Sequence, residues 1–170
     1  ALAMKVYFTP NTAAVKSLAR IGLTFRVKDT FGKVEYNGRG DIETYNDRKE
    51  AGLIGHYKTT AEAMFHYYVK PQATGNRTDV RWMSLSDTRN RLMVAAKTPF
   101  QFSVTPFSDS VIDRATHINQ LSRDGLLTVH LDANQSGVGT ATCGPGVAEK
   151  YRVPVKPTSF EFVLYPAMAK

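Results

Sequence analysis

Residues 20–28 have the sequence Arg-Ile-Gly-Leu-Thr-Phe-Arg-Val-Lys, in which large apolar side chains alternate with polar or small ones. An extended chain places successive side chains on opposite faces, so Ile21, Leu23, Phe25 and Val27 share one face of a strand. The period is two rather than 3.6, which indicates a fold built on β-sheets. We expect the apolar face to lie in the core.

The same pattern recurs along the chain, and in the last strand Phe160, Phe162 and Leu164 share a face. Helix signals are few: Ser108 can cap a short helix that ends at Arg114, and residues 59–65 can form one or two turns. Short strands separated by Gly and Pro predict an all-β, antiparallel sandwich. The other predicted strands are residues 5–9, 34–36, 80–85, 91–94, 100–104, 126–132 and 159–165.

Length and composition predict a single globular domain, residues 1–170. The chain is 42% hydrophobic and 22% charged, and it is long enough to bury a core without cross-links. Its one cysteine, Cys143, excludes an internal disulfide and a multi-cysteine zinc site. The chain contains no apolar run of about 18 residues, so we expect no membrane-spanning helix. Its first ten residues lack the apolar stretch of a secretion signal.

The net charge of +7 raises the question of nucleic acid. Basic residues are spread along the whole chain, without a block and without interleaved aromatics. This distribution favours a solvated surface over a nucleic-acid patch.

Four histidines, His56, His66, His117 and His130, are scattered without ligand spacing, so we expect no metal site. His130 lies in the middle of a predicted strand and faces away from its apolar neighbours. This position predicts a place at the surface or on a second sheet.

Two segments combine charges with aromatic residues. Glu43 and Asp47, with Arg48, could form a glycosidase-like acid pair, but spacing in sequence does not set distance in space. An ion-paired turn with inward-packed tyrosines is the favoured interpretation. Trp82 could stack on a sugar, yet its place within an alternating strand favours the core.

Residues 135–146 hold five glycine or proline residues and predict a long ordered loop, where function often resides. The segment has neither the nucleophile-elbow order nor the phosphate-loop pattern. Cys143 has no basic neighbour within the loop, which favours a structural thiol over a nucleophile.

Four motifs follow one another in a characteristic order. Together they resemble the C-terminal domain (domain 5, the small-chain-like region) of bacterial beta-galactosidases of glycoside hydrolase family two, from about Met4 to Tyr165. The motifs are Ala19-Arg-Ile-Gly-Leu23, Tyr36-x-Gly-x-Gly-x-x-Glu-x-Tyr-x-Asp-Arg48, Pro71-Gln-x-x-Gly-Asn-Arg-x-x-x-Arg-Trp82 and Leu131-Asp-x-x-Gln-x-Gly-Val-Gly-x-x-x-Cys-Gly-Pro145.

The resemblance implies a β supersandwich similar to galactose mutarotase, as the C-terminal portion of a multidomain enzyme. The catalytic glutamates would lie in a TIM barrel outside this chain, so it should contain no catalytic residue and be inactive alone. The parent would hydrolyse terminal β-D-galactosides with retention. No cofactor is expected in this chain, because relatives use Mg and Na in other domains.

The implied partners are the remaining domains of the parent beta-galactosidase and a β-galactoside substrate at its edge. Neither nucleic acid nor membrane is expected, and a homo-oligomer of the parent is possible. The compartment, bacterial cytoplasm or periplasm, stays open.

The resemblance also implies roles for individual residues. The 135–145 loop would reach the active-site mouth, and Cys143 falls near the position at which relatives carry a sugar-stacking aromatic residue, after a shortening by one residue. Asp41 replaces a usual proline. The implied substrate-edge residues are Gln135, Ser136, Gly137, Gly139, Thr142 and Cys143. The implied structural residues are Tyr36, Gly38, Gly40, Glu43, Tyr45, Asp47, Arg48, Asn76, Arg77, Arg81 and Trp82.

Two alternatives belong to other classes of protein. A free-standing carbohydrate-binding module would need exposed aromatics on one face or in the loop. A small mutarotase-like enzyme would need a histidine beside a carboxylate in one cleft, and the candidates are His56, His66 and His130.

Overall fold

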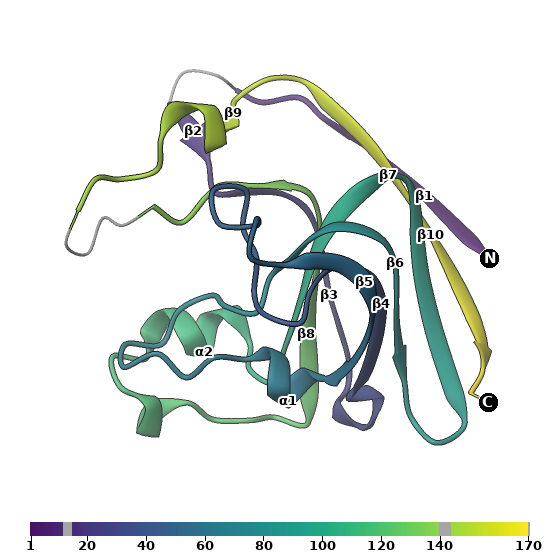
Figure 1. Cartoon of the computed structure of the whole chain (residues 1–170). Coiled ribbons are helices and arrows are strands. Elements are labelled where there is room, and N and C mark those ends of the chain that lie inside the picture. Colours follow the sequence, from purple (N-terminus) through teal and green to yellow (C-terminus); the bar gives the residue numbers. More distant parts are fainter. Residues whose placement is uncertain (12–14, 140–143, 170) are drawn as a thin grey trace.

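The computed structural model describes residues 1–11, 15–139 and 144–169 and consists mainly of antiparallel strands (Figure 1). Two short α-helices and three 3-10 turns complete it. The strands are β1 (Leu2–Phe8), β2 (Ser17–Leu18), β3 (Arg20–Lys28), β4 (Lys33–Gly40), β5 (Leu53–Thr60), β6 (Arg77–Ser86), β7 (Asn90–Thr105), β8 (Leu126–Gln135), β9 (Val153–Pro154) and β10 (Thr158–Met168). The helices are α1 (Ala61–Met64) and α2 (Asp109–Arg114), and the 3-10 turns are η1 (Asp29–Phe31), η2 (Ile118–Gln120) and η3 (Glu149–Tyr151).

The long strand β7 joins the two parts of the sheet. Its first half pairs with β10 and its second half with β8, while β6, β4 and β5 continue on its other side. β3 pairs with β8, and β1 pairs with β10. Where two strands were predicted at 91–94 and 100–104, the chain forms one. Within the described chain, residues 96–99 of β7 have no cross-strand partner in the register. Pro99 lies in this stretch, so its missing N–H leaves the ladders intact.

The predicted apolar faces lie against one core, which confirms the all-β sandwich. Ile21 is buried, and Leu23, Phe25 and Val27 pack against the central cluster. On β10, Phe162 is buried while Phe160 and Leu164 pack beside it.

The helix start predicted at Ser108 and the turns predicted within 59–65 are also confirmed. Ser108 Oγ accepts a hydrogen bond from the N–H of Val111 at the start of α2, and Thr60 Oγ1 accepts one from Ala63 at the start of α1. No helix within the described residues is long and apolar enough to cross a membrane.

Further features differ from the sequence-based expectation. β5 was not predicted, because it is an edge strand paired only with β4 and lacks a buried apolar face. Trp82 was expected in the core but is only partly buried. The register of β6 shifts between Val80 and Trp82, so Val80 and Met83 occupy the core face in spite of their odd spacing.

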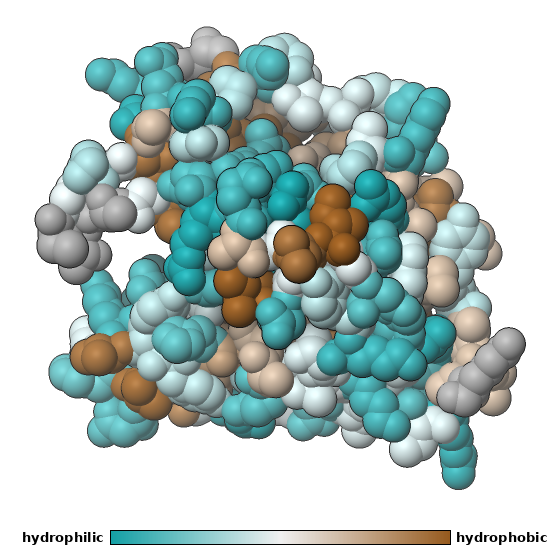
Figure 2. Space-filling model, viewed as in Figure 1, coloured by the Kyte–Doolittle hydropathy of each residue, from teal (hydrophilic) through white to brown (hydrophobic). Residues whose placement is uncertain are grey.

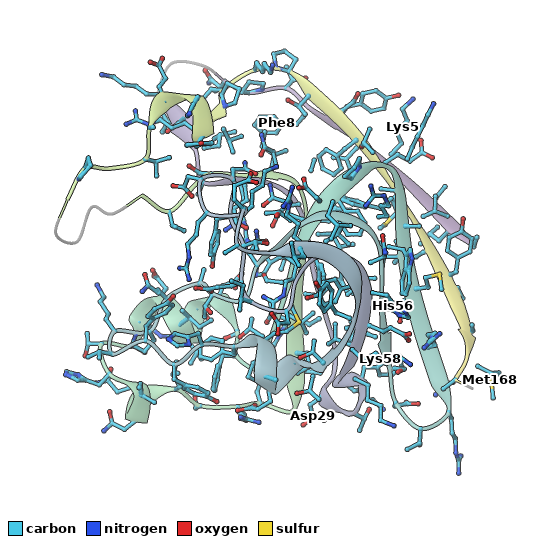
Figure 3. All side chains as sticks on the ribbon, viewed as in Figure 1. Lys5, Phe8, Asp29, His56, Lys58 and Met168 are labelled. Atoms are coloured by element: carbon cyan, nitrogen blue, oxygen red, sulfur yellow. The ribbon has the colours of Figure 1, made fainter. Side chains whose placement is uncertain are left out.

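The β5 edge is partly apolar and partly charged. Figure 2 shows apolar residues gathered near the centre of one face, over the region of β5, where Leu53 and Ile54 are exposed. Figure 3 labels His56 and Lys58 on the same strand, and both lie against Glu35, at 2.7 and 3.6 Å from its Oε1. Charged side chains on an edge strand oppose uncontrolled pairing with other strands.

Candidate functional site

The sheet formed by β3, β8 and β7 carries polar side chains on the face opposite the core. Core residues alternate along β7 and β8 with these polar residues, which are nevertheless buried. Burial of hydroxyl, imidazole and carboxylate groups is unfavourable unless they find partners, so a buried polar face is a strong sign of function. The cross-strand rows are Gly22–Asp132–Gln101, Thr24–His130–Ser103 and Arg26–Thr128–Thr105.

A cavity of about 640 Å³ lies over this face. α2 and the segment 70–74 cover it, and Figure 1 shows α2 and the chain that follows α1 together on the same side of β8. Ser103, Thr105 and His130 line it from the sheet. The other lining residues are Arg20 from β3, Asp109, Ser110, Ile112 and Asp113 from α2, and Lys70, Pro71, Gln72, Ala73 and Thr74 from the covering segment.

His130 lies in the sheet wall of this cavity and is 5% exposed, so it is buried rather than at the surface. Its Nδ1 lies 3.0 Å from Thr24 Oγ1, and its Nε2 lies 3.0 Å from Asp109 Oδ1. Burial, followed by the nearby Arg20 charge, lowers the pKa of His130 below its ordinary value, although Asp109 opposes this. Of the three candidate histidines, His130 has a carboxylate beside it in a cavity, but both ring nitrogens are engaged.

Arg20 connects the cavity to the start of the glycine-rich loop. Its Nη2 lies 3.0 Å from Asp132 Oδ2 and donates to Gln135 Oε1 at 3.0 Å. Burial raises the pKa of Asp132 to about 7, because desolvation outweighs the attraction of the guanidinium. A protonatable carboxyl therefore lies two residues from His130, on the same face of β8.

Asp47 holds the described part of the loop from the side. Its Oδ1 accepts the N–H of Val138 at 3.0 Å and its Oδ2 accepts the N–H of Gly139 at 2.8 Å. Gly137 lies so close to the Asp47 carboxylate that a Cβ there would overlap it. The N–H of Ser136 donates to Ala19 O and that of Gly137 to Tyr151 O, so every residue from 136 to 139 is tied by its backbone. The predicted edge residues Thr142 and Cys143 lie outside the described residues.

An amide network links this loop to the polar sheet face. Asn76 Nδ2 donates to Gln101 Oε1 at 2.8 Å, and Gln101 Nε2 donates to Asn46 Oδ1 at 3.1 Å. Asn46 Nδ2 donates in turn to Gln135 O and to Asn134 Oδ1. Asn46 was not singled out from the sequence, although it stands between two motif residues.

Glu43 occupies a different environment from Asp47. Its carboxylate accepts hydrogen bonds from the hydroxyls of Tyr68 and Thr74 and from the N–H of Gly75, and Arg48 Nη1 lies 3.5 Å away. Burial alone would raise the pKa of Glu43, but these hydrogen bonds outweigh it and lower the pKa.

Tyr45 packs inward at 3% exposure, and burial raises the pKa of its phenol. Glu43 and Asp47 are thus held by separate partners: Glu43 by hydroxyls, an N–H and Arg48, and Asp47 by the loop backbone. Glu43 thus makes the expected ion pair with Arg48, whereas Asp47 binds the loop backbone.

The remaining motif residues pack around a buried tyrosine or lie near the surface. Arg77 Nε donates to Tyr36 Oη at 2.9 Å, and its Nη2 donates to Asp41 O. Gly38 lies against Val80, and Gly40 lies so close to the Tyr36 hydroxyl that a Cβ on residue 40 would overlap it.

Arg81 is exposed, and the Trp82 ring meets the His56 ring edge to face at 5.3 Å. Exposed aromatics among the described residues include Tyr7, Tyr67 and Tyr165, which come from β1, the segment after α1 and β10. They form no single platform of the kind a binding module would use.

The described residues contain no group of three or more His, Cys, Asp or Glu side chains that could hold a metal ion. Sequence analysis also missed Ser103, Thr105 and Asp109. The signal that could have revealed the two β7 residues is the chemistry of the alternation: the non-core positions within 101–105 of β7 and 128–132 of β8 carry Gln, Ser, Thr, His and Asp, and no Lys or Glu.

Comparison with known proteins gives one consistent result. The family model described as beta galactosidase small chain matches residues 1–164. A beta-galactosidase of Staphylococcus xylosus is 29% identical over 147 residues, which is 86% of this chain and 15% of that protein. A beta-galactosidase of Kluyveromyces lactis is 33% identical over 149 residues, 85% of this chain and 14% of that protein. For Actinobacillus pleuropneumoniae the identity is 31%, covering 80% of this chain and 13% of the relative. The chain thus spans about one seventh of the length of these relatives.

Proposed function

Because the chain belongs to the beta galactosidase small chain family, we propose that it acts as the C-terminal β-sandwich of a beta-galactosidase. In this role the 135–145 loop shapes one edge of an active site whose catalytic carboxylates lie in other domains. The parent reaction is retaining hydrolysis of terminal β-D-galactosides. The chain alone is not catalytic.

The observation that carries this proposal is the way the loop is held. Asp47 binds two successive loop N–H groups, and Arg20 and Asn46 hold Gln135 at its base. A loop that serves as one wall of a substrate site must keep its position without relying on the substrate. Val138 is 45% exposed on this tethered segment and is available for contact with another surface.

The partners that we propose are the other domains of the parent enzyme. The apolar residues Leu53 and Ile54 on the unpaired edge of β5 are 75% and 49% exposed, and such a patch favours burial against a neighbouring domain. The spread of basic residues supports no nucleic-acid role.

The test is complementation. The purified chain is assayed alone for hydrolysis of a nitrophenyl β-D-galactoside. It is also co-expressed with the Kluyveromyces lactis relative, truncated before the segment that matches this chain, and the pair is assayed in the same way. We expect no turnover from either part alone and turnover from the pair. Hydrolysis by the chain alone would overturn the proposal.

The role of the loop is tested in the same pair. Asp47→Asn in this chain should lower kcat/KM, because the loop loses its charged acceptor. Asp87→Asn serves as the matched control, since Asp87 also accepts two backbone N–H bonds, from Arg89 and Asn90, in a turn remote in sequence. Equal effects of the two substitutions would contradict an edge role for the loop.

A further inference from the structure

We propose that the cavity between α2 and the β3–β8–β7 sheet binds a neutral monosaccharide in its pyranose form. This site lies within the chain itself and does not depend on the proposed role of the loop. The inference rests on the chemistry of the cavity floor, the balance of charge around it and its size.

The floor is made of groups that both donate and accept hydrogen bonds. Ser103 and Thr105 contribute hydroxyls from β7 and lie next to His130 on β8, and the three residues are only 4–5% exposed. Hydroxyl groups suit other hydroxyl groups, because each can reverse its donor and acceptor roles. A buried polar floor of this kind is unfavourable in a purely structural sandwich, where a covering helix would meet apolar residues.

The walls carry charges of both signs in equal number. Arg20 and Lys70 stand against Asp109 and Asp113, so the cavity offers no net positive field for a phosphate or a polyanion. Carboxylates accept hydrogen bonds from neighbouring sugar hydroxyls, while guanidinium and ammonium groups donate to them.

The cavity also provides an apolar side. Ile112, Pro71 and Ala73 line it together with the polar groups, and a pyranose has one face of C–H groups that needs such contact. The volume of about 640 Å³ lies within the range of small-molecule sites and leaves room for a monosaccharide with bound water.

The test is a titration of the isotopically labelled chain with D-galactose, followed by backbone amide NMR. We expect saturable shifts at residues 103–105, 109–113 and 130, with a dissociation constant of about 1–10 mM. Ser103→Ala should weaken binding about 3- to 10-fold, the loss that follows from one hydrogen bond. Ser84→Ala is the matched control, because Ser84 is a buried serine on β6 that does not line the cavity.

A second variant guards against a folding defect. Asp109→Asn changes a carboxylate whose side chain is 59% exposed, so the fold should tolerate it, and galactose binding should weaken by a similar factor. Glu161→Gln, an exposed carboxylate on β10, should leave binding unchanged.

Several results would overturn the proposal. One is the absence of a saturable shift at about 200 mM galactose, a concentration that would fill a site of millimolar affinity. Another is an equal affinity of the Ser103→Ala and Ser84→Ala variants for galactose. Shifts confined to residues 136–139 would place the sugar at the loop instead. Tighter binding of inorganic phosphate at residues 103–113 would show an anion site and would also overturn it.

Discussion

The carboxylate of Asp47 accepts the backbone N–H of Gly139 at 2.8 Å, from a position 92 residues earlier in the chain. With the second bond, from the N–H of Val138, one side chain from the β4–β5 connection holds the start of the glycine-rich loop. Val138 and Gly139 are therefore held by a distant carboxylate, and this relationship can be tested directly.

Asp47→Asn should loosen the loop. The carboxylate accepts one N–H with each oxygen, whereas an amide has a single acceptor oxygen and no charge. We therefore expect a loss of about 1–3 kcal/mol in local stability. Amide hydrogen exchange at Val138 and Gly139 measures it, with faster exchange expected at both. The turn variant Asp87→Asn should leave these two amides unchanged, and similar exchange in the two variants would contradict the assignment.

Gly137→Ala should also disturb the loop, but through space rather than charge. A methyl group at this position overlaps the Asp47 carboxylate, so one of the two must move, at a cost of about 1–3 kcal/mol. Gly146→Ala, where an added methyl meets nothing within 4 Å, should change stability by less than about 1 kcal/mol. Thermal unfolding of the two variants provides the comparison, and equal losses would be inconsistent with the packing of Gly137.

Asp132→Asn should change how stability depends on pH. Burial raises the folded-state pKa to about 7, above the unfolded value of about 3.9, so the folded protein binds the proton more tightly. The contribution of this proton is fully present below about pH 4 and is lost as the pH rises to about 7. Relative to the wild type, the variant should therefore gain up to about 4 kcal/mol between pH 4 and pH 8. Urea unfolding across this range measures the gain, and a pH-independent difference would contradict the prediction.

Glu43→Gln should show the opposite pH dependence. Hydrogen bonds from Tyr68, Gly75 and Thr74 outweigh burial and lower the folded-state pKa, so the ionised group stabilises the fold above the unfolded pKa of about 4.3. We expect the variant to lose about 1.5–3 kcal/mol at pH 7 and the difference to shrink as the pH falls below about 4. Glu50→Gln, at an exposed position nearby, is the control and should change stability by less than about 0.5 kcal/mol.

Much of the fold could be predicted because it depends on local pattern. The alternation in residues 20–28 correctly placed Ile21, Leu23, Phe25 and Val27 toward the core, and Ser108 correctly marked the start of α2. β5 was missed because Leu53–Thr60 show no apolar alternation and none of these residues is buried. Trp82 was misplaced because a register shift in β6 changes the face of every residue beyond it, and the sequence carries no sign of that shift.

The candidate site was less accessible from the sequence. The motifs identified Asp47, Asn76, Gln135 and the loop glycines as important, but gave no distances between them. The pairing of His130 with Asp109, and the closeness of Arg20 to both Asp132 and Gln135, follow from strand register and from where α2 lies.

The sequence by itself determined which side chains share a face, because the alternation of a strand is a property of neighbouring residues. It also determined the family, through motifs that keep their order along the chain. Only the tertiary structure decided what covers each face. The apolar side of β7 and β8 became the core and their polar side a cavity floor, because α2, which follows β7, and residues 70–74, which precede β6, both lie over the polar side. Their placement depends on long-range pairing, and no local pattern encodes it.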